Sequence, residues 1–470
     1  MKKQNIIHWF RQDLRLSDNP SLSFACENGQ LIPVYIFDNI NSGKFSEGQA
    51  SKTWLHESLI LLNRSLSGRL LVLEGDPNEI LSKLAHDNNV SFVTWNRCYA
   101  PWQIERDTDI KKSLIDQGIN CKSFNGSLLW EPWEILKNDG TPYKVFTPFY
   151  RKGCLGSGPP REPLPKPKEI TYVKDIACHQ IINPKSFSTK NWQDKILGHA
   201  AIGEEKAAET KLAFLNSGIS NYKNGRNFPS AENVSRLAPN LHFGEISPNQ
   251  IWSKVKALPS DENTDHFLSE LGWREFSNYL LYHFPKITNQ NLQSKFDSFP
   301  WINNKSHLKK WQTGHTGIPM VDAGMRELWQ TGSMHNRLRM IVGSFLVKNL
   351  LIDWRYGASW FWDCLFDADI ANNTAGWQWI AGCGADAAPY FRIFNPITQG
   401  EKFDPDGAYI KRYVPELGNL GLKDLFCPWE ASEKSLTDAG VILGENYPLP
   451  IVSLKESRQL ALEAFNSLKK

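Results

Sequence analysis

The sequence predicts two parts of different fold class, a doubly wound α/β domain with a parallel sheet followed by a large all-α domain. Short apolar runs alternate with helix-like stretches over the first 125 residues. Five prolines then fall between residues 159 and 167, which is typical of an extended connector. After residue 200 the apolar residues recur at three- and four-residue spacing, as in packed helices. We therefore predict an α/β domain at 1–125, a connector at 126–199 and a helical domain at 200–470.

Apolar runs rich in valine, isoleucine and aromatic residues predict the buried strands, at 6–10, 31–37, 70–74 and 92–95. Helical spacing predicts the helices of the first part at 49–66, 77–87 and 102–118. The same spacing predicts helices of the second part at 200–216, 265–283, 319–330 and 335–351. The first run is followed by Arg11-Gln12-Asp13 and not by a glycine-rich loop, so the usual dinucleotide fingerprint is not expected there.

Composition excludes several classes of protein. Hydrophobic residues make up 41% and charged residues 22%, which argues against a mainly disordered chain. No apolar run reaches the roughly 18 residues of a membrane-spanning helix, and the N-terminal run is too short for a signal peptide. The eight cysteines include no Cys-x-x-Cys pair, so we expect a cytoplasmic location. Zinc-hydrolase, P-loop and serine-elbow signatures are missing, and no metal site is expected.

Tryptophan is unusually frequent, with 18 residues in the chain and ten of them between Trp252 and Trp379. The net charge of +3 is too small to indicate nucleic-acid binding by itself. However, residues 300–355 contain eight Lys or Arg against three Asp or Glu. Basic residues interleaved with tryptophan suit a groove for a phosphate backbone and unstacked bases. Core packing and a solvated helical surface are the alternatives.

Three segments contain candidate functional residues. The pair Ser235-Arg236 lies in a loop before a predicted helix and is suited to holding a phosphate, although a capping serine beside a surface arginine is commoner. Glu270, Trp273 and Arg274 share one helical face that suits a stacked, hydrogen-bonded base, or else form an ion pair beside a core tryptophan. A third helical face contains Asn336, Arg339 and Met340.

Six ordered motifs are spread over nearly the whole chain, at 9–16 (WFRQDLRL), 143–149 (YKVFTPF), 316–323 (TGIPMVDA), 334–340 (MHNRLRM), 377–379 (WQW) and 384–396 (GADAAPYFRIFNP). With these motifs the chain resembles the DNA photolyase/cryptochrome family, and most closely its bacterial cyclobutane pyrimidine dimer photolyases. The resemblance implies that the helical domain binds FAD in a U-shaped conformation, at the bottom of a cavity that faces DNA.

The resemblance also implies roles for single residues. The flavin phosphates and ribityl chain would be cradled by Tyr222, Val234, Ser235, Arg236, Leu237 and Ala238. Phe267, Arg274 and Asn336 would line the cofactor pocket. Near the ring, Arg339 would pair with Asp367, Asp369 would accept or donate a hydrogen bond, and Asn373 would face N5. A cation beside the ring favours an anionic reduced flavin.

The implied reaction is repair of UV-damaged DNA by electron transfer from light-excited reduced FAD to a flipped-out cyclobutane pyrimidine dimer. Trp273 and Trp379 would stack on the lesion, while Glu270, Asn336, Arg337 and Met340 would contact its edge, its flank or the adjoining backbone. Glu270 would also take part in catalysis. A chain of three tryptophans, Trp377, Trp354 and Trp301, would carry the electron that reduces an oxidised flavin.

Several positions discriminate among branches of the family. Asn336 and Met340 stand where six-four photolyases carry histidine, and Asn373 is typical of photolyases, so repair of cyclobutane dimers is favoured. A cryptochrome-like photoreceptor without repair activity is the alternative, and a DNA-binding module that has lost its flavin is a more distant one. Val234, Ala238 and Ser333 depart from the family pattern and predict weaker retention of FAD.

A second, antenna chromophore is expected in the N-terminal domain. Gln103, in the segment 96–103, stands where folate-binding relatives have an acidic residue, so a folate, a deazaflavin and a flavin all remain candidates. The expected partner is UV-damaged DNA, with no membrane and no protein partner, and the chain is expected to be a monomer.

Overall fold

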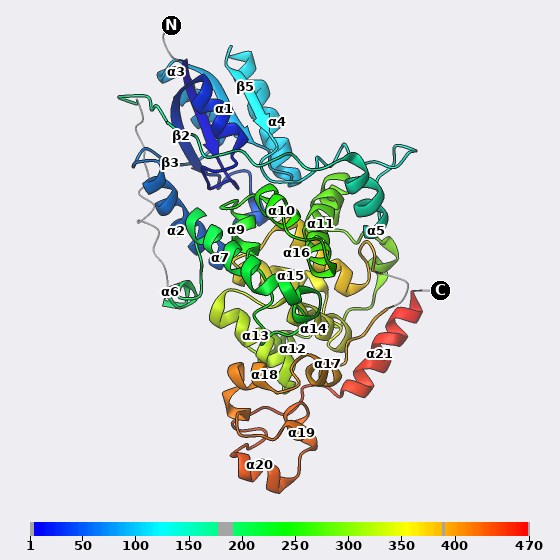
Figure 1. Ribbon diagram of the computed structural model, residues 1–470. Helices are drawn as coiled ribbons and strands as arrows, with labels where there is room; N and C mark the ends of the chain where they lie inside the picture. Colours follow the sequence, from blue (N-terminus) through cyan, green and yellow to red (C-terminus); the bar gives the residue numbers. More distant parts are fainter. Residues whose placement is uncertain (1–3, 177–190, 388–390, 469–470) are drawn as a thin grey trace. The chain divides into compact units, whose positions relative to one another are not determined.

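The structure is a computed structural model that describes residues 4–176, 191–387 and 391–468 (Figure 1). Its chain forms two compact units: a first unit of residues 1–193, 200–220 and 235–285, and a second unit of 194–199, 221–234 and 286–470. Part of the predicted connector, and Ala388, Pro389 and Tyr390 of the last motif, lie outside the described residues. The domain boundaries predicted at 125 and 199 stay predictions.

The first unit contains a five-stranded parallel sheet with the strand order β3-β2-β1-β4-β5. The strands are β1 (Gln4–Phe10), β2 (Gly29–Phe37), β3 (Leu71–Glu74), β4 (Val90–Asn96) and β5 (Asn120–Phe124). In the central strand, Ile7 lies opposite Ile32 of β2 and Val93 of β4, and all three side chains are buried. The four predicted strands are confirmed, and β5 is an additional one.

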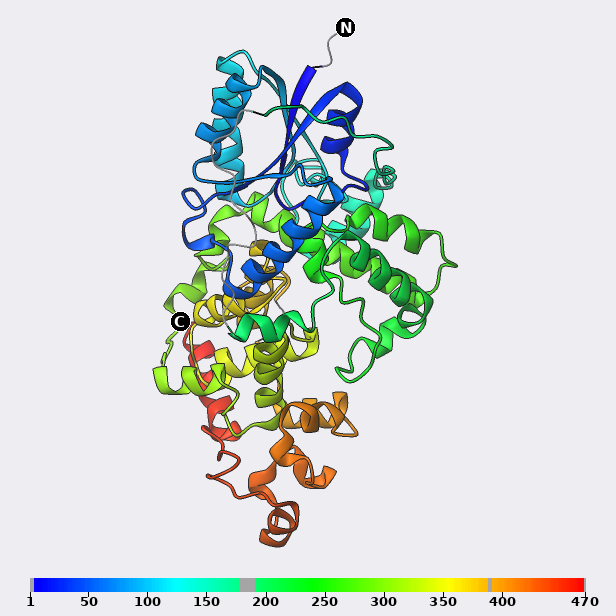
Figure 2. The same cartoon turned by 90° about the vertical axis from the view of Figure 1, so that its left-hand side faces the viewer.

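Helices cover both faces of this sheet, as a doubly wound fold requires. Helix α1 (Pro20–Asn28) packs on β1, β2, β4 and β5, while α3 (Pro77–Asp87) and α4 (Pro101–Asp116) pack on β4 and β5 respectively. Figure 2 shows α1 on one face and the α3–α4 pair on the other. Helix α2 spans Gln49–Ser65. The α/β fold class of the N-terminal part is therefore confirmed.

The remaining helices of the first unit include a long one, α11 (Glu262–His283), which begins at a capping box formed by Asp261 and Thr264. Helix α10 packs against it. The others are α5 (Phe146–Pro148), the π-type turn η2 (Phe149–Cys154), α7 (Glu204–Asn216), α9 (Ala238–His242) and α10 (Pro248–Lys256). Helix α7 starts four residues later than predicted. Gly203, the residue before it, has a φ of +96°, and a right-handed α-helix cannot include that backbone conformation.

The second unit is helical and packs around one large apolar core. Its helices are most of α6 (Asn191–Leu197), then α8 (Tyr222–Gly225), α12 (Lys305–Gln312), α13 (Pro319–Thr331), α14 (Asn336–Ser344), α15 (Trp354–Cys364), α16 (Ile370–Ala381), α17 (Pro396–Phe403), α18 (Ala408–Tyr413), α19 (Leu422–Leu425), α20 (Glu433–Ala439) and α21 (Leu454–Ser467). Helix α14 packs against α13 and α16, and α15 packs against α16.

The single helix predicted at 335–351 is wrong in its second half. Helix α14 ends at Ser344 and continues as the wider π-type turn η8 (Phe345–Asn349), in which Leu350 N–H donates to the carbonyl of Phe345, 3.0 Å away. Leu351 then takes a positive φ of 49°, which ends the helical path. Apolar spacing alone does not distinguish such a turn from an α-helix. No helix in the described part of the chain is long and apolar enough to cross a membrane.

Candidate functional site

Helix α14 carries four predicted site residues on the side that faces away from its core contacts. Asn336 is exposed, and Arg337, Arg339 and Met340 are half-buried. The opposite side is buried against α13 and α16 through Leu338, Ile341 and Val342. The apolar side therefore fixes the helix, and the polar side is left to contact a ligand.

A charge pair links α14 to the segment before α16, as predicted. Arg339 Nη2 lies 2.9 Å from both carboxylate oxygens of Asp367, and Arg339 Nε donates to the carbonyl of Met334 at 2.9 Å. The side chains of Arg339 and Asp367 are 27% and 11% exposed. Charge-assisted bonds in so protected a position hold the guanidinium in one orientation.

Two further predicted residues lie at the start of α16. Asp369 is the N-cap of the helix, because its Oδ1 accepts from the backbone N–H of Asn372 at 2.8 Å. Asn373 Nδ2 donates to the carbonyl of Ala358 in α15 at 3.0 Å, which directs the amide group. The structure thus brings Arg339, Asp367, Asp369 and Asn373 to one short region where the start of α16 meets α14 and α15.

The predicted tryptophan chain lies in and against the large apolar core. Trp354 and Trp377 are each 2% exposed, whereas Trp301 and Trp379 are partly buried and pack against the core. The indole of Trp377 packs tightly against Gly357 of the neighbouring helix α15. A Cβ added to Gly357 would lie 2.1 Å from Trp377 Cη2, so any side chain there would displace the ring.

Gln378, between Trp377 and Trp379, is a positioning residue that the sequence reasoning missed. Its Nε2 donates to the carbonyls of Ile287 and Gln290 at 2.7 and 2.9 Å, and its Oε1 accepts from Leu292 N at 2.9 Å. The side chain is 2% exposed. Buried amides with both ends satisfied orient the elements that they join, and here α16 is fixed against residues 287–292.

A basic cluster lies beside α14 in the second unit. Arg337 donates to Asn227 Oδ1, and its guanidinium lies 4.1 Å from the centre of the Phe403 ring. Burial lowers the pKa of Arg337, and the charge of nearby Arg226 lowers it further. Arg226 in turn lies over the ring of Tyr222, a buried predicted residue at the start of α8, at 5.4 Å. Two guanidinium groups that repel each other favour an anion between or beside them.

Val234, the other predicted cradle residue in this unit, is half-buried. The rest of that predicted cradle belongs to the first unit. Arg236 is exposed with φ +54°, Leu237 is buried, and Leu237 N–H lies 3.4 Å from Ser235 Oγ. Ala238 is exposed at the start of the short helix α9.

Helix α11 of the first unit carries the remaining predicted residues. Phe267 is buried, and the Trp273 ring stacks on Phe146 with centroids 3.8 Å apart and planes 11° apart. Glu270 is 27% exposed, and its Oε1 lies 3.7 Å from His266 Nε2. Parallel stacking at this distance fixes the plane of the indole.

Arg274 is occupied within the first unit by a contact that the sequence did not predict. Its Nη1 donates to the carbonyl of Ser127 at 2.8 Å and lies 3.3 Å from Glu275 Oε1. Glu275 also accepts from the backbone N–H of Leu129 at 2.8 Å. Burial raises the pKa of Glu275 to about 7, against the opposing effect of Arg274. These bonds join α11 to residues 127–129, so Arg274 has a structural role here.

Several polar groups of the segment 96–103 are hydrogen-bonded within the first unit, whereas the buried Nε1 of Trp102 has no partner among the described residues. Asn96 Nδ2 donates to Asp13 at 2.6 Å, and Tyr99 Oη donates to Glu131 at 2.9 Å. Gln103 is buried, with 8% of its surface exposed. The segment therefore acts as an internal hydrogen-bonded junction, a role that no pattern in the sequence predicted.

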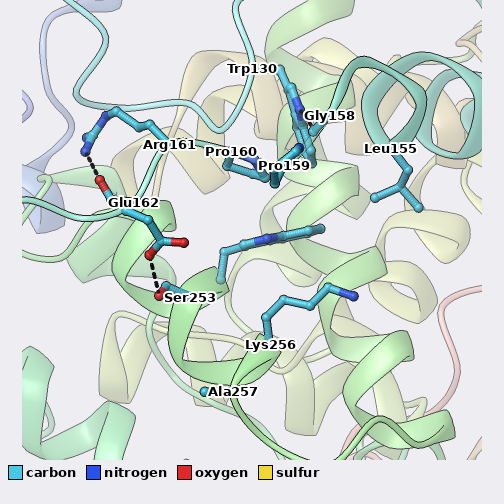
Figure 3. Close-up of a pocket in the computed structure, with 11 residues that line it drawn as sticks. Trp130, Leu155, Gly158, Pro159, Pro160, Arg161, Glu162, Ser253, Lys256 and Ala257 are labelled. Atoms are coloured by element: carbon cyan, nitrogen blue, oxygen red, sulfur yellow. Dashed lines mark hydrogen bonds between the residues drawn. The ribbon is translucent and has the colours of Figure 1, made fainter.

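The first unit contains an open pocket of about 520 Å³ (Figure 3). Two indoles form much of its wall, Trp130 and Trp252, whose rings meet edge to face with centroids 5.3 Å apart. Pro159 and Pro160 add apolar surface, and the amino group of Lys256 lies 5.7 Å from the Trp252 ring. Flat apolar walls suit a planar ligand, and Lys256 and Arg161 add positive charge beside the carboxylate of Glu162.

Two family models match the chain: DNA photolyase over residues 6–168, and the FAD binding domain of DNA photolyase over residues 267–467. The deoxyribodipyrimidine photo-lyase of Agrobacterium fabrum is 45% identical over 479 residues, covering 100% of this chain and 99% of the relative. Cryptochrome-2 of Arabidopsis thaliana is 37% identical and covers 99% of this chain and 79% of the relative. A bacterial class III photolyase from Agrobacterium tumefaciens superposes with a TM-score of 0.95 at 43% identity, covering 100% of this chain and 98% of that one.

Proposed function

Because the chain belongs to the DNA photolyase/cryptochrome family, we propose that it uses blue light to repair cyclobutane pyrimidine dimers in DNA, with FAD as its cofactor. The observation that supports this most is the outward side of α14, where Asn336 and Met340 lie beside the Arg339–Asp367 pair. An amide, a thioether and a fixed guanidinium on one helix suit a pyrimidine edge and an electron-rich ring.

The side chains near the start of α16 fit the flavin of FAD. A guanidinium, two carboxylates and an amide match a heterocycle that carries both N–H and C=O groups at its edge, and Arg339, Asp367, Asp369 and Asn373 supply them. When bound, FAD supplies light-driven one-electron transfer. The weaker retention expected from Val234, Ala238 and Ser333 stays a prediction.

The lesion is proposed to be bound by aromatic and polar side chains of α14 and α16 in the second unit, and α11 of the first unit offers candidate contacts of its own. A dimer stacks and pairs poorly, so extruding it from the duplex costs less than extruding intact bases. Trp273 and Trp379 offer stacking surfaces, while Glu270 and Asn336 offer hydrogen bonds to the pyrimidine edges. Glu270 also orients the lesion, because its carboxylate accepts a hydrogen bond from a pyrimidine N–H.

The basic cluster of Arg226 and Arg337 is proposed to hold a backbone phosphate of the damaged strand. Both guanidinium groups lie in the second unit, and Arg337 is oriented by Asn227 and Phe403. A phosphate would relieve the repulsion between them, so binding should weaken as salt rises. Loss of one phosphate contact would weaken binding of all sequences about equally.

The test is loss of a single thymine dimer from an oligonucleotide, mixed with the reduced, FAD-loaded protein in blue light and in darkness. We expect repair in the light only. Glu270→Ala should lower the repair yield and leave photoreduction of the oxidised flavin intact. Bound flavin without repair would instead support the cryptochrome-like photoreceptor.

We also propose that the pocket lined by Trp130 and Trp252 holds the second chromophore expected from the sequence. The indole walls and Lys256 support this. In the segment 96–103, by contrast, Asn96 is already hydrogen-bonded to Asp13 of the same unit. Trp252→Ala should remove any near-ultraviolet absorbance beyond that of FAD and leave the FAD spectrum intact. An unchanged spectrum would rule out this site. The monomeric state and cytoplasmic location stay predictions.

A further inference from the structure

The indole nitrogens of the tryptophan chain have different surroundings. Trp354 Nε1 donates to Asn291 Oδ1 at 3.0 Å. Trp377 Nε1 is buried and has no hydrogen-bond partner among the residues that the structure describes. Its indole is enclosed by Phe361 and Trp311, with ring centroids 4.9 and 6.2 Å away. The indoles of Trp354 and Trp377 are therefore equally buried, but the surroundings of Trp354 are polar and those of Trp377 are apolar.

The hydrogen bond from Trp354 to Asn291 is followed by a second one, from Asn291 to Asp297. Asn291 Nδ2 donates to Asp297 Oδ1 at 2.7 Å, so a carboxylate polarises the amide whose oxygen accepts from Trp354. Asn291 is 9% exposed, and Asp297 lies at the surface. In series, such bonds strengthen one another, and the negative end of the amide dipole, Asn291 Oδ1, points at the indole N–H.

We propose that Asn291 and Asp297 are positioning residues that set the direction of electron flow along the tryptophan chain, by stabilising positive charge on Trp354 relative to Trp377. This rests on the proposed function. An acceptor on Nε1 stabilises the indole radical cation more than the neutral indole, because the N–H becomes more acidic and more positive on oxidation. Trp377 has no such acceptor among the described residues, so its radical cation is the less stable one.

The step moves one electron. After Trp377 has lost an electron to light-excited, oxidised FAD, an electron passes from Trp354 to the Trp377 radical cation. Trp377 becomes neutral, Trp354 becomes the radical cation, and no bond forms or breaks. The Nε1 proton stays on Trp354, because a carboxamide oxygen is too weak a base to take it. An external thiol then replaces the missing electron through Trp301, which is partly exposed.

One charged group opposes this effect. The guanidinium of Arg355 lies 4.7 Å from the Trp354 ring and would destabilise a radical cation there. However, Arg355 Nη1 lies 2.9 Å from Asp353 Oδ2, so the two charges largely cancel at the indole. Asp297 forms no ion pair with any residue that the structure describes, so its negative charge adds to the effect of Asn291 and favours oxidation of Trp354.

The test uses the full-length, FAD-loaded protein with oxidised flavin and a thiol reductant. Asn291→Leu removes the acceptor at nearly constant volume. Asn349→Leu is the matched control, since Asn349 is 7% exposed and donates to Ser457 Oγ rather than contacting an indole. A hydrogen bond to a charged group shifts an equilibrium constant by about 10-fold or more, here that of electron transfer from Trp354 to the Trp377 radical cation. The photoreduction quantum yield of Asn291→Leu should therefore fall about 10-fold. Asn349→Leu should stay within about 2-fold of wild type.

Asp297→Asn is a milder variant at an exposed position, which keeps the hydrogen-bond chain and removes the charge. Its yield should fall about 3-fold, because surface charges are partly screened. In darkness, the NMR signal of the Trp354 indole N–H, assigned with Trp354→Phe, should move in Asn291→Leu and not in Asn349→Leu.

Equal yields for Asn291→Leu and Asn349→Leu would overturn the proposal, and so would an Asp297→Asn yield equal to wild type. A wild-type protein that is photoreduced but does not repair dimers would overturn the proposed function and leave this test valid. A wild-type flavin that is never photoreduced through Trp377 would overturn this proposal alone, because repair by the pre-reduced protein does not need the tryptophan chain.

Discussion

Lys348, in the turn η8, should make the stability of this protein depend on pH through its buried amino group. The residue is 1% exposed, and its Nζ donates to the carbonyl of Arg392 at 3.2 Å and lies 3.5 Å from the centre of the Phe391 ring. Burial lowers the pKa of Lys348 from 10.5 to about 7, although Cys383 acts in the opposite direction. Lys348→Met keeps the length and the apolar stem and removes the titration.

The sign follows from proton binding. The unfolded chain keeps the proton up to about pH 10.5 and the folded chain releases it near pH 7, so between these values the unfolded state binds more protons. Stability of the wild type therefore rises with pH in this window. Across pH 7 to 9, at about 1.36 kcal/mol per pH unit and with partial titration near pH 7, the gain is about 2 kcal/mol.

Urea denaturation of the FAD-loaded protein at pH 7, 8 and 9 measures this gain, at constant ionic strength. The difference between wild type and Lys348→Met cancels the other titrating groups, provided that both have the same m-value. Lys309→Met, on the exposed side of α12, is the control and should follow the wild type. Parallel pH profiles of wild type and Lys348→Met would show that the amine is not held neutral, and would refute the reasoning.

Trp377→Phe should abolish photoreduction of oxidised flavin, yet leave repair by the pre-reduced protein within about 2-fold of wild type; loss of both would contradict the proposed division of roles. Tyr409→Phe removes a hydroxyl that donates to Glu327 Oε2 at 2.5 Å, and that oxygen also accepts from His335 N at 3.3 Å. The turn before α14 should loosen and the dark affinity for dimer-containing DNA should fall about 3- to 10-fold; unchanged affinity would mean that Glu327 holds the turn alone. Glu275→Gln removes a carboxyl whose pKa is about 7 in the folded protein and 4.5 in the unfolded chain. The folded wild type therefore binds more protons between pH 4.5 and 7 and loses stability as the pH rises through that window. The variant should gain up to about 3 kcal/mol on the wild type across that window in denaturant titrations, and a constant difference would argue against a protonated Glu275.

Hydrophobic pattern predicted the sheet well except for the edge strand β5. The strands β1 to β4 are apolar runs, whereas β5 reads Asn-Cys-Lys-Ser-Phe and has no buried residue. An edge strand needs only one hydrogen-bonded neighbour and can be polar, so periodicity gives little signal for it. The break after Ser344 was missed for a related reason, because an apolar π-type turn and an apolar helix look alike in sequence.

Around the candidate site, motif resemblance located the Arg339–Asp367 pair, which the structure confirms. It did not identify Asn291, Gln378 or Asn227, which act through hydrogen bonds to groups far away in the sequence. A polar residue in a loop or a buried helix has no periodic partner, so only the folded chain shows which group it contacts.

The glycine contact of Trp377 bears on how fast an electron can leave that indole. A Cβ added to Gly357 would lie 2.1 Å from Trp377 Cη2, so the indole packs tightly against that glycine and has little room to shift towards α15. Apolar neighbours such as Phe361 also carry no dipoles that must turn when the charge changes. The reorganisation energy for oxidation should therefore be small. Electron loss from Trp377 should then depend only weakly on temperature, so that photoreduction persists in the cold, where motions of solvent and side chains are slow.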